Sequence, residues 1–189
     1  MNDIASRYLK HHFLIAMPHM ADRNFAQTLV YLVEHNEHGA MGLVVNRLGK
    51  LSLADALEQL RPDGTIDARC RQLSLHAGGP VHTERGFVLH PPGWHYQATV
   101  ELDELALTTS QDVLLAIADG YGPERFLIAL GYAGWEAGQL EAELLDNAWL
   151  TCPADPAVLF DVAVEQRLAC ATARLGIDLG RLSSQVGHA

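Results

Sequence analysis

One acidic residue stands out among the side chains that could carry out acid–base chemistry. On a helical wheel of the segment after Trp135, Ala137, Leu140 and Leu145 define an apolar side, and Glu141 falls within it. A carboxylate on an apolar helix face must be paired or hydrogen-bonded, or its pKa rises. Two interpretations follow, a structural carboxylate with a buried partner and a functional acid.

Histidines offer a second kind of chemistry, metal binding or proton transfer. His35 and His38 are three residues apart, but they fall in a predicted hairpin loop, where this spacing fixes no ligand geometry. A solvated polar loop is the simpler interpretation, and we predict neither a metal site nor a cofactor. Four further histidines flank a Gly-Gly-Pro sequence and could either gather in space or be satisfied separately: His76, His82, His90 and His95.

Two glycine-containing segments could bind a ligand through their backbone. Gly78 and Gly79 precede Pro80, and successive glycines allow N–H groups to form a concave anion site. A turn between two strands is the alternative. Gly131 and Gly134 form neither a P-loop nor a dinucleotide fingerprint, and no GxSxG nucleophile elbow occurs. The sequence therefore contains no complete catalytic motif.

These residues favour a binding or regulatory module without catalysis, which contacts a protein or a small molecule. A small enzyme that uses Glu141 or the histidines is one alternative. The predicted contact surface lies in the loops around Gly78 and Gly131. Its candidate residues are Gly78, Gly79, Arg85, Gly131, Gly134, Trp135, Gln139 and Glu141.

The segment from Phe126 to Leu150 has the pattern of a strand, a glycine turn at Gly131 and Gly134, a helix and a second strand. Residues 28–35 and 40–46 predict a hairpin whose continuous apolar runs indicate that both faces are covered. Further strands are predicted at 73–76 and 86–90, with one or two more between 97 and 108. A loop is expected from 62 to 71.

Helices are predicted where capping residues precede apolar periodicity. One spans 52–60 behind a Ser52–Asp55 capping box, and another follows a box at residues 109–112 and ends at Gly120. The last helical region begins at Asp155 and stops at Gly176. It is either buried all round in its first half or broken near residue 161. The pattern as a whole predicts one α+β domain spanning residues 1–189.

Charge and composition limit the classes of partner. The chain has 23 acidic and 13 basic residues, a formal net charge of −10, which disfavours nucleic acid and anionic membranes. No apolar segment approaches the roughly 20 residues of a membrane span. FLIAM at 13–17 is too short for the core of a signal peptide. Cys70, Cys152 and Cys170 form no CxxC motif, and this sparse, odd set favours a reducing compartment, the cytosol.

Several long blocks resemble the AlgH/YqgE family of bacterial proteins. They include LIAMPHMADRNFAQTLVYLVEHNEHGAMGLVVN, GGPVHTERGFVLH, LTTSQDVL, GYAGWEAGQLEAELLDNAWL and LGIDLGRLSSQVGHA. One departure is the absence of a proline in Asn46-Arg47-Leu48. The resemblance implies an α+β domain whose branched sheet curls into a pseudo-barrel with helices outside. It also brings the family label of transcriptional regulator, a second alternative function, which the acidic charge and the lack of a DNA-binding motif disfavour.

Overall fold

The computed structural model describes residues 8–178, and its strands form a ten-stranded sheet. Residues 1–7 and 179–189 lie outside the described part, and the second of these ranges includes most of the last sequence block. The strands are β1 (His12–Ala16), β2 (Leu29–Asn36), β3 (Gly39–Val44), β4 (Leu48–Ser52), β5 (Ser74–Ala77), β6 (Val81–His90), β7 (Thr99–Leu102), β8 (Leu105–Thr108), β9 (Leu127–Glu136) and β10 (Trp149–Pro153). The helices are α1 (Leu53–Leu60), α2 (Ala68–Gln72), α3 (Asp112–Ala118), α4 (Gln139–Leu145), α5 (Pro156–Phe160) and α6 (Arg167–Arg174), with a 3-10 turn η2 (Val164–Gln166).

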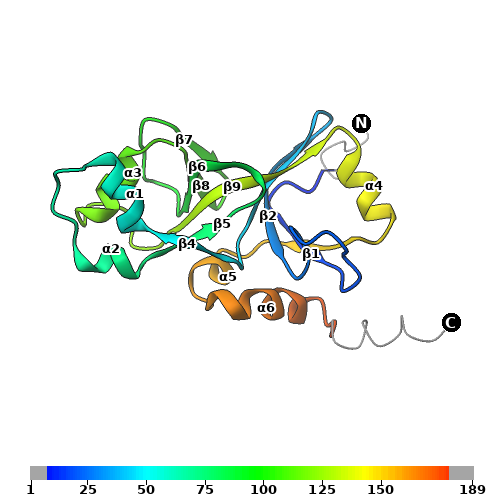
Figure 1. Ribbon diagram of the computed structural model, residues 1–189. Coiled ribbons are helices and arrows are strands. Elements are labelled where there is room, and N and C mark those ends of the chain that lie inside the picture. Colours follow the sequence, from blue (N-terminus) through cyan, green and yellow to red (C-terminus); the bar gives the residue numbers. More distant parts are fainter. Residues whose placement is uncertain (1–7, 179–189) are drawn as a thin grey trace.

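The sheet branches at β9, which runs between its two halves (Figure 1). Ala129 and Leu130 of β9 pair with β5 on one side and with β6 on the other. Farther along, residues 133–136 pair with β3. One half of the sheet continues from β3 through β2 and β1 to β10, and the other contains β4, β5, β6, β8 and β7. The expected α+β fold with a branched, curled sheet is confirmed.

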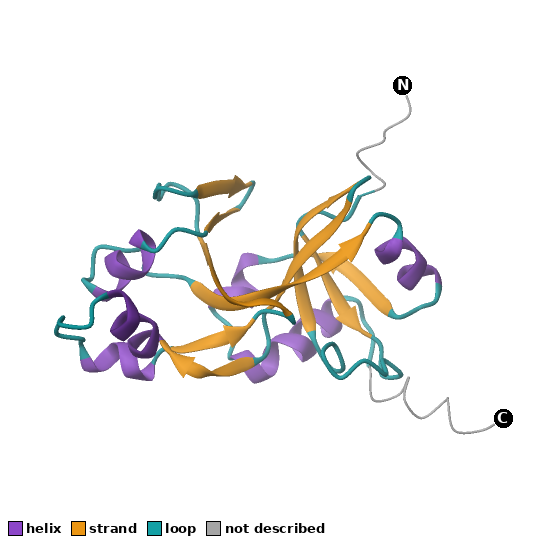
Figure 2. Cartoon of the chain, turned by 45° about the horizontal axis from the view of Figure 1, so that its top comes forward, coloured by secondary structure: helices purple, strands orange, loops and turns teal. Residues whose placement is uncertain are grey.

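The helices pack outside this sheet. Helices α1, α2 and α3 gather at the end formed by β4 to β9, whereas α4 covers the opposite end and α5 and α6 lie below (Figures 1 and 2). Among residues 8–178, no helix is long and apolar enough to cross a membrane.

The side chains of β1 alternate between two buried clusters, which explains why the sequence of the first strands is continuously apolar. Phe13 and Ile15 enter one buried cluster, and Leu14 and Ala16 enter another on the opposite face. The hairpin of β2 and β3 likewise contributes to both clusters, as the sequence predicted. A third cluster lies between α1, α3 and the strands β5, β6 and β9.

The predicted turn at Gly131 and Gly134 is wrong, because β9 continues through both residues. The reason is a crossing of two backbones. The Gly78–Gly79 connection leads from β5 on one side of β9 to β6 on the other, so it must pass over β9. A Cβ on Gly79 would overlap the carbonyl of Tyr132, and one on Gly131, where φ is +72°, would overlap the carbonyl of Gly79. Gly79 and Gly131 are therefore needed because the two backbones approach too closely for a side chain, and not because the chain turns at Gly131.

Some of the other local predictions are confirmed and others are wrong. Ser52 caps α1 in a complete capping box, and Asp155 caps α5 with Pro156 at its start. The last helical region is broken, since α5 ends at Phe160 and α6 begins at Arg167. The box at 109–112 is wrong, because the residue before α3 is Gln111, whose side chain makes no capping bond. Helix α2 replaces part of the predicted loop, and β4 was missed.

Candidate functional site

A groove lies on the sheet face between α1 and α3, in the half that contains β4 to β9. Its volume is about 560 Å³. The base is apolar and is built from neighbouring strands and the two helices, with the side chains of Leu51, Ala56, Leu60, Leu75, Val88, Leu114 and Leu130. Of these, Leu75 and Val88 are buried, whereas Leu51 is 45% exposed.

The groove exists because the helices are too short to cover the sheet. An α-helix rises 1.5 Å per residue, so α1 and α3 are each only about 10–12 Å long. The strands β4, β5, β9, β6 and β8 lie about 4.8 Å apart, which gives this face a width of about 19 Å. Part of the apolar face therefore stays open.

Polar side chains form the rim of the groove. Antiparallel pairing of Val88 with Thr108 sets the chain after β8 alongside the part of β6 that precedes Val88. Hydroxyl and amide groups therefore gather near Arg85. The exposed or half-buried polar lining residues are Gln59, Thr83, Glu84, Arg85, Thr109, Ser110 and Gln111, and the buried Thr108 also lines the groove.

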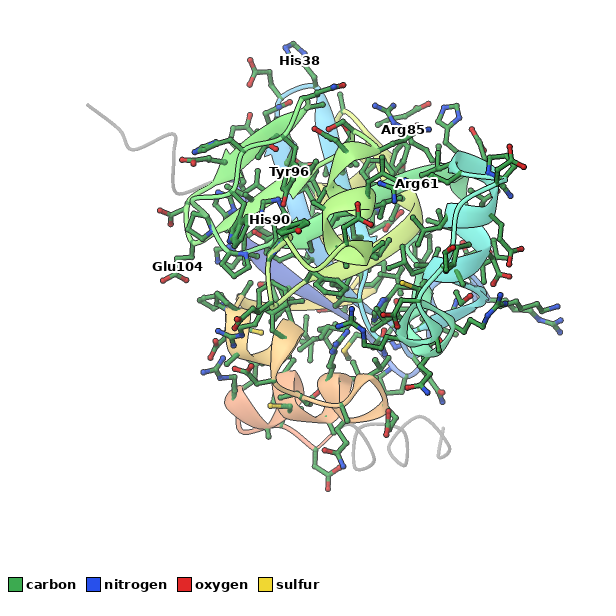
Figure 3. All side chains as sticks on the ribbon, turned by 90° about the vertical axis from the view of Figure 1, so that its left-hand side faces the viewer. His38, Arg61, Arg85, His90, Tyr96 and Glu104 are labelled. Atoms are coloured by element: carbon green, nitrogen blue, oxygen red, sulfur yellow. The ribbon has the colours of Figure 1, made fainter. Side chains whose placement is uncertain are left out.

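The charges at this rim come from Arg85 and Glu84. The Arg85 guanidinium lies 5.6 Å from the centre of the Phe87 ring and makes no ion pair with a described carboxylate. Figure 3 views this end of the molecule, where Arg85 and Arg61 are both labelled. Arg61, by contrast, pairs with Asp119 at 2.9 Å. The Glu84 carboxylate lies 3.4 Å from the imidazole of His82.

A buried chain of hydrogen bonds includes Thr108, which lines the groove, and His90, which is labelled in Figure 3. His90 Nδ1 donates to the Pro91 carbonyl at 2.8 Å, so its Nε2 must accept the hydroxyl proton of Thr108, also at 2.8 Å. Thr99 in turn donates to Thr108 at 2.8 Å. Burial lowers the pKa of His90, which agrees with a neutral ring.

The Thr108–His90 contact resembles a nucleophile and its base, but burial argues against catalysis. Thr108 and His90 are both 0% exposed, so a substrate atom has no access to the hydroxyl oxygen. Both imidazole nitrogens are also engaged. The contact therefore holds β6 and β8 together.

The remaining histidines of the predicted group do not gather. His76 is buried, donates from Nδ1 to the Ile128 carbonyl and accepts from Arg167 at 2.9 Å. Burial, reinforced by the nearby Arg167 charge, lowers the pKa of His76 to about 4. His82 faces Glu84, and His95 lies 3.8 Å from Glu101. Within residues 8–178, no three His, Cys, Asp or Glu side chains are arranged to hold a metal ion.

Arg167 is a buried cation without a carboxylate partner among the described residues. Its Nε donates to the Val162 carbonyl at 3.1 Å, and its Nη1 donates to the Val45 carbonyl at 2.6 Å and to His76. Burial lowers its pKa. These bonds join α6 to the strands at the branch of the sheet.

Glu141 pairs with a histidine that the sequence analysis had considered separately. His35 Nδ1 accepts the backbone N–H of Leu9 at 2.9 Å, so its Nε2 donates to Glu141 at 3.1 Å. The His35 side chain is 1% exposed and that of Glu141 is 30% exposed. Both nitrogens of His35 are occupied, which fits the structural interpretation of Glu141 better than the catalytic one. His38 is exposed and does not share this site.

Glu143, opposite the apolar side of the α4 helical wheel, has the most hydrogen-bonded carboxylate of this helix. One of its oxygens accepts from the indoles of Trp135 at 2.9 Å and Trp149 at 2.8 Å. The other accepts from Gln139 at 2.9 Å. The ring of Phe25 packs against both indoles. The only sequence signal was the pair of tryptophans, which need acceptors when buried.

The predicted contact residues fall into three separate places. Gly78, Gly79 and Gly131 form the backbone crossing, where the Gly78 N–H already donates to Leu130, so no open anion site is formed there. Arg85 lines the groove. The others lie on the far half of β9 and on α4: Gly134, Trp135, Gln139 and Glu141.

Comparison with known proteins identifies the family of this chain. A family model described as AlgH-like matches residues 13–180. The UPF0301 protein AlgH of Pseudomonas aeruginosa is 68% identical over 189 residues, which is 100% of both chains. The chain belongs to the AlgH-like family. A UPF0301 protein of Stutzerimonas stutzeri is 66% identical, also over 100% of both chains.

Solved structures agree with the AlgH-like fold. The solution structure of AlgH from Pseudomonas aeruginosa matches with a TM-score of 0.83 at 68% identity over 100% of both chains. A crystal structure of a Corynebacterium diphtheriae protein matches with a TM-score of 0.72 at 19% identity, over 90% of this chain and 89% of that one, a likeness of fold alone. The resemblance seen in the sequence blocks is confirmed. The names of these relatives state a family and no activity.

Proposed function

We propose that this AlgH-like protein is a single-domain, non-catalytic binding module, and that its groove holds a small molecule with a large apolar part. The supporting observation is the groove itself, an open apolar face rimmed by polar groups. Its volume of about 560 Å³ lies within the range of about 300–1,000 Å³ that is usual for small-molecule sites. The apolar base would bind the body of the ligand, and the hydroxyls and amides would orient its polar end.

The chemistry of the lining supports binding over an enzymatic function. Its titratable side chains are Glu84 and Arg85, both exposed, and no histidine, cysteine or aspartate lines it. The neighbouring His90 has no free nitrogen. A general base needs both a free acceptor atom and access to the substrate.

Charge pairing supports a small-molecule partner over DNA. Arg61, Arg69 and Arg71, the densest cation group in the sequence, lie 2.9, 3.2 and 3.5 Å from Asp119, Asp67 and Glu58, respectively. A DNA surface needs cations that are free to contact phosphates. At low salt, the protein should leave the gel mobility of duplex DNA unchanged. A shift that weakens as salt rises would favour the regulator alternative.

The state of the cysteines supports the cytosol as the compartment. Cys70 and Cys152 are buried, Cys170 is half-buried, and all are free thiols. Free cysteines are typical of a reducing environment.

The proposal is tested by titrating the ¹⁵N-labelled protein with decanoate and with decanol, which share an aliphatic chain and differ in their head groups. Amide shifts should cluster at residues 83–88 and 108–114. In Gly86→Leu the new side chain enters open space beside the groove, because a Cβ at Gly86 meets nothing within 4 Å, and it should block binding. Ala137→Leu adds the same side chain at an exposed site outside the groove and should bind normally. Absence of binding by both probes, or shifts outside the groove, would contradict the proposal.

A further inference from the structure

A second surface, outside the groove, carries exposed aromatic side chains. Trp94 is 38% exposed and Tyr121 is 79% exposed, and both line an open hollow of about 570 Å³. Large aromatic side chains supply much of the affinity at protein interfaces because they bury a wide apolar area with few rotatable bonds. The other lining residues are Pro91, Gly120, Gly122, Pro123, Glu124 and Arg125.

The backbone beneath these aromatic residues is held in place. Helix α3 ends where Gly120 has a φ of +81°, and its N–H donates to Ile117 at 3.2 Å. The next N–H, of Tyr121, donates to Ala116 at 2.9 Å. These capping bonds fix where the chain leaves the helix. The exposed ring of Tyr121 is thus presented from a defined position.

The walls of the hollow point to the backbone conformation of a partner. Pro91 and Pro123 have no N–H to donate, so at these two positions the walls lack the donors that pairing with an added β-strand uses. A polyproline II segment needs no such ladder, because it has no internal hydrogen bonds and presents proline rings. Grooves lined by aromatic residues bind such segments.

The charges in the hollow indicate which charge the partner segment carries beside its prolines. The Glu124 carboxylate makes no hydrogen bond or ion pair with a described residue. Arg125, in contrast, pairs with Asp161 and stacks on the Phe160 ring at 5.4 Å. The free charge of the hollow is therefore negative, which favours a cationic side chain beside the prolines.

We propose that this hollow is a docking surface for a proline-rich segment of another protein that carries an arginine or lysine. Its prolines pack against Trp94 and Tyr121, and its cation lies against Glu124. This surface is independent of the small-molecule groove.

The test uses the whole protein and an acetylated, amidated peptide, Arg-Pro-Pro-Ala-Pro-Pro-Ala-Pro, followed by calorimetry and amide shifts. The peptide should bind with shifts at residues 91–94 and 120–125. Trp94→Ala and Tyr121→Ala should each weaken binding about tenfold or more. Both side chains are exposed, so the variants should fold, as circular dichroism would verify. Leu145→Ala removes an apolar side chain on α4 that is 83% exposed, close to the 79% of Tyr121, and this variant should bind like the wild type.

Two comparisons separate the parts of the proposal. A peptide with alanine in place of every proline should not bind. Glu124→Gln should weaken binding of the arginine peptide but leave a peptide with alanine in place of its arginine unaffected. The proposal is overturned if the proline peptide does not bind, if the alanine peptide binds equally well, or if Trp94→Ala and Tyr121→Ala both bind like the wild type.

Discussion

Acid should destabilise this protein, and His76 should account for a large part of the loss. The buried His76 ring must be neutral, because its Nε2 accepts an N–H of Arg167. Burial and the Arg167 charge lower its pKa from 6.5 to about 4 in the folded protein. Between these values the unfolded chain binds a proton that the folded protein does not, so this stability is present above pH 6.5 and is lost as the pH falls toward 4. At 1.36 kcal/mol per pKa unit, the loss is about 3 kcal/mol.

The assay is urea unfolding followed by circular dichroism at a series of pH values from neutral to acidic. The free energy of unfolding of the wild type should fall steadily with pH. His76→Gln, which cannot be protonated, should show a clearly smaller fall. Some slope should remain, because burial also lowers the pKa of His11 and His90. The exposed variant His38→Gln is the control and should keep the wild-type slope. An unchanged slope in His76→Gln would refute the reasoning.

Three further predictions follow from individual contacts. Glu143→Ala leaves two indole N–H groups without their acceptor and should lower the free energy of unfolding by about 2–4 kcal/mol. Glu143→Gln keeps an acceptor oxygen and should lose less stability. Equal losses for the two variants in urea titrations would contradict this prediction. Gly131→Ala places a Cβ against a crossing carbonyl and should cost about 3 kcal/mol or more, while Gly86→Ala, facing open space, should have little effect on the melting temperature. Ser52→Ala removes the cap of α1 and should cost about 1 kcal/mol in the same melts, so an unchanged stability would show that the box contributes nothing.

Local chemistry made much of the fold predictable. The continuous apolar runs at the start of the chain indicated strands covered on both faces, and Phe13 and Leu14 enter opposite clusters. Ser52 and Asp155 marked helix starts because a side-chain cap acts within a few residues.

Features set by distant contacts could not be predicted in this way. Gly131 resembled a turn residue, since a left-handed φ is usually needed in turns, but here it accommodates the backbone of Gly79, which lies 52 residues earlier in the chain. Glu143 lies on the polar side of the wheel, and only the folded chain brings two indoles to it.

The candidate site was hidden for the same reason. Of the residues predicted as a contact surface, Arg85 alone lines the groove. The groove depends on short helices over a wide sheet face, and no motif encodes that mismatch. The partner of Glu141 was likewise invisible, because His35 is 106 positions away in the sequence.

The most direct test of the groove as a ligand site is an isotope-filtered nuclear Overhauser measurement on the protein saturated with decanoate. The account predicts contacts from the methylene protons of the ligand to the methyl groups of Leu60, Leu114 and Leu130. Contacts should be absent at Leu145, an exposed leucine outside the groove. Contacts confined to other apolar patches, or none in a sample where the ligand is bound, would contradict it.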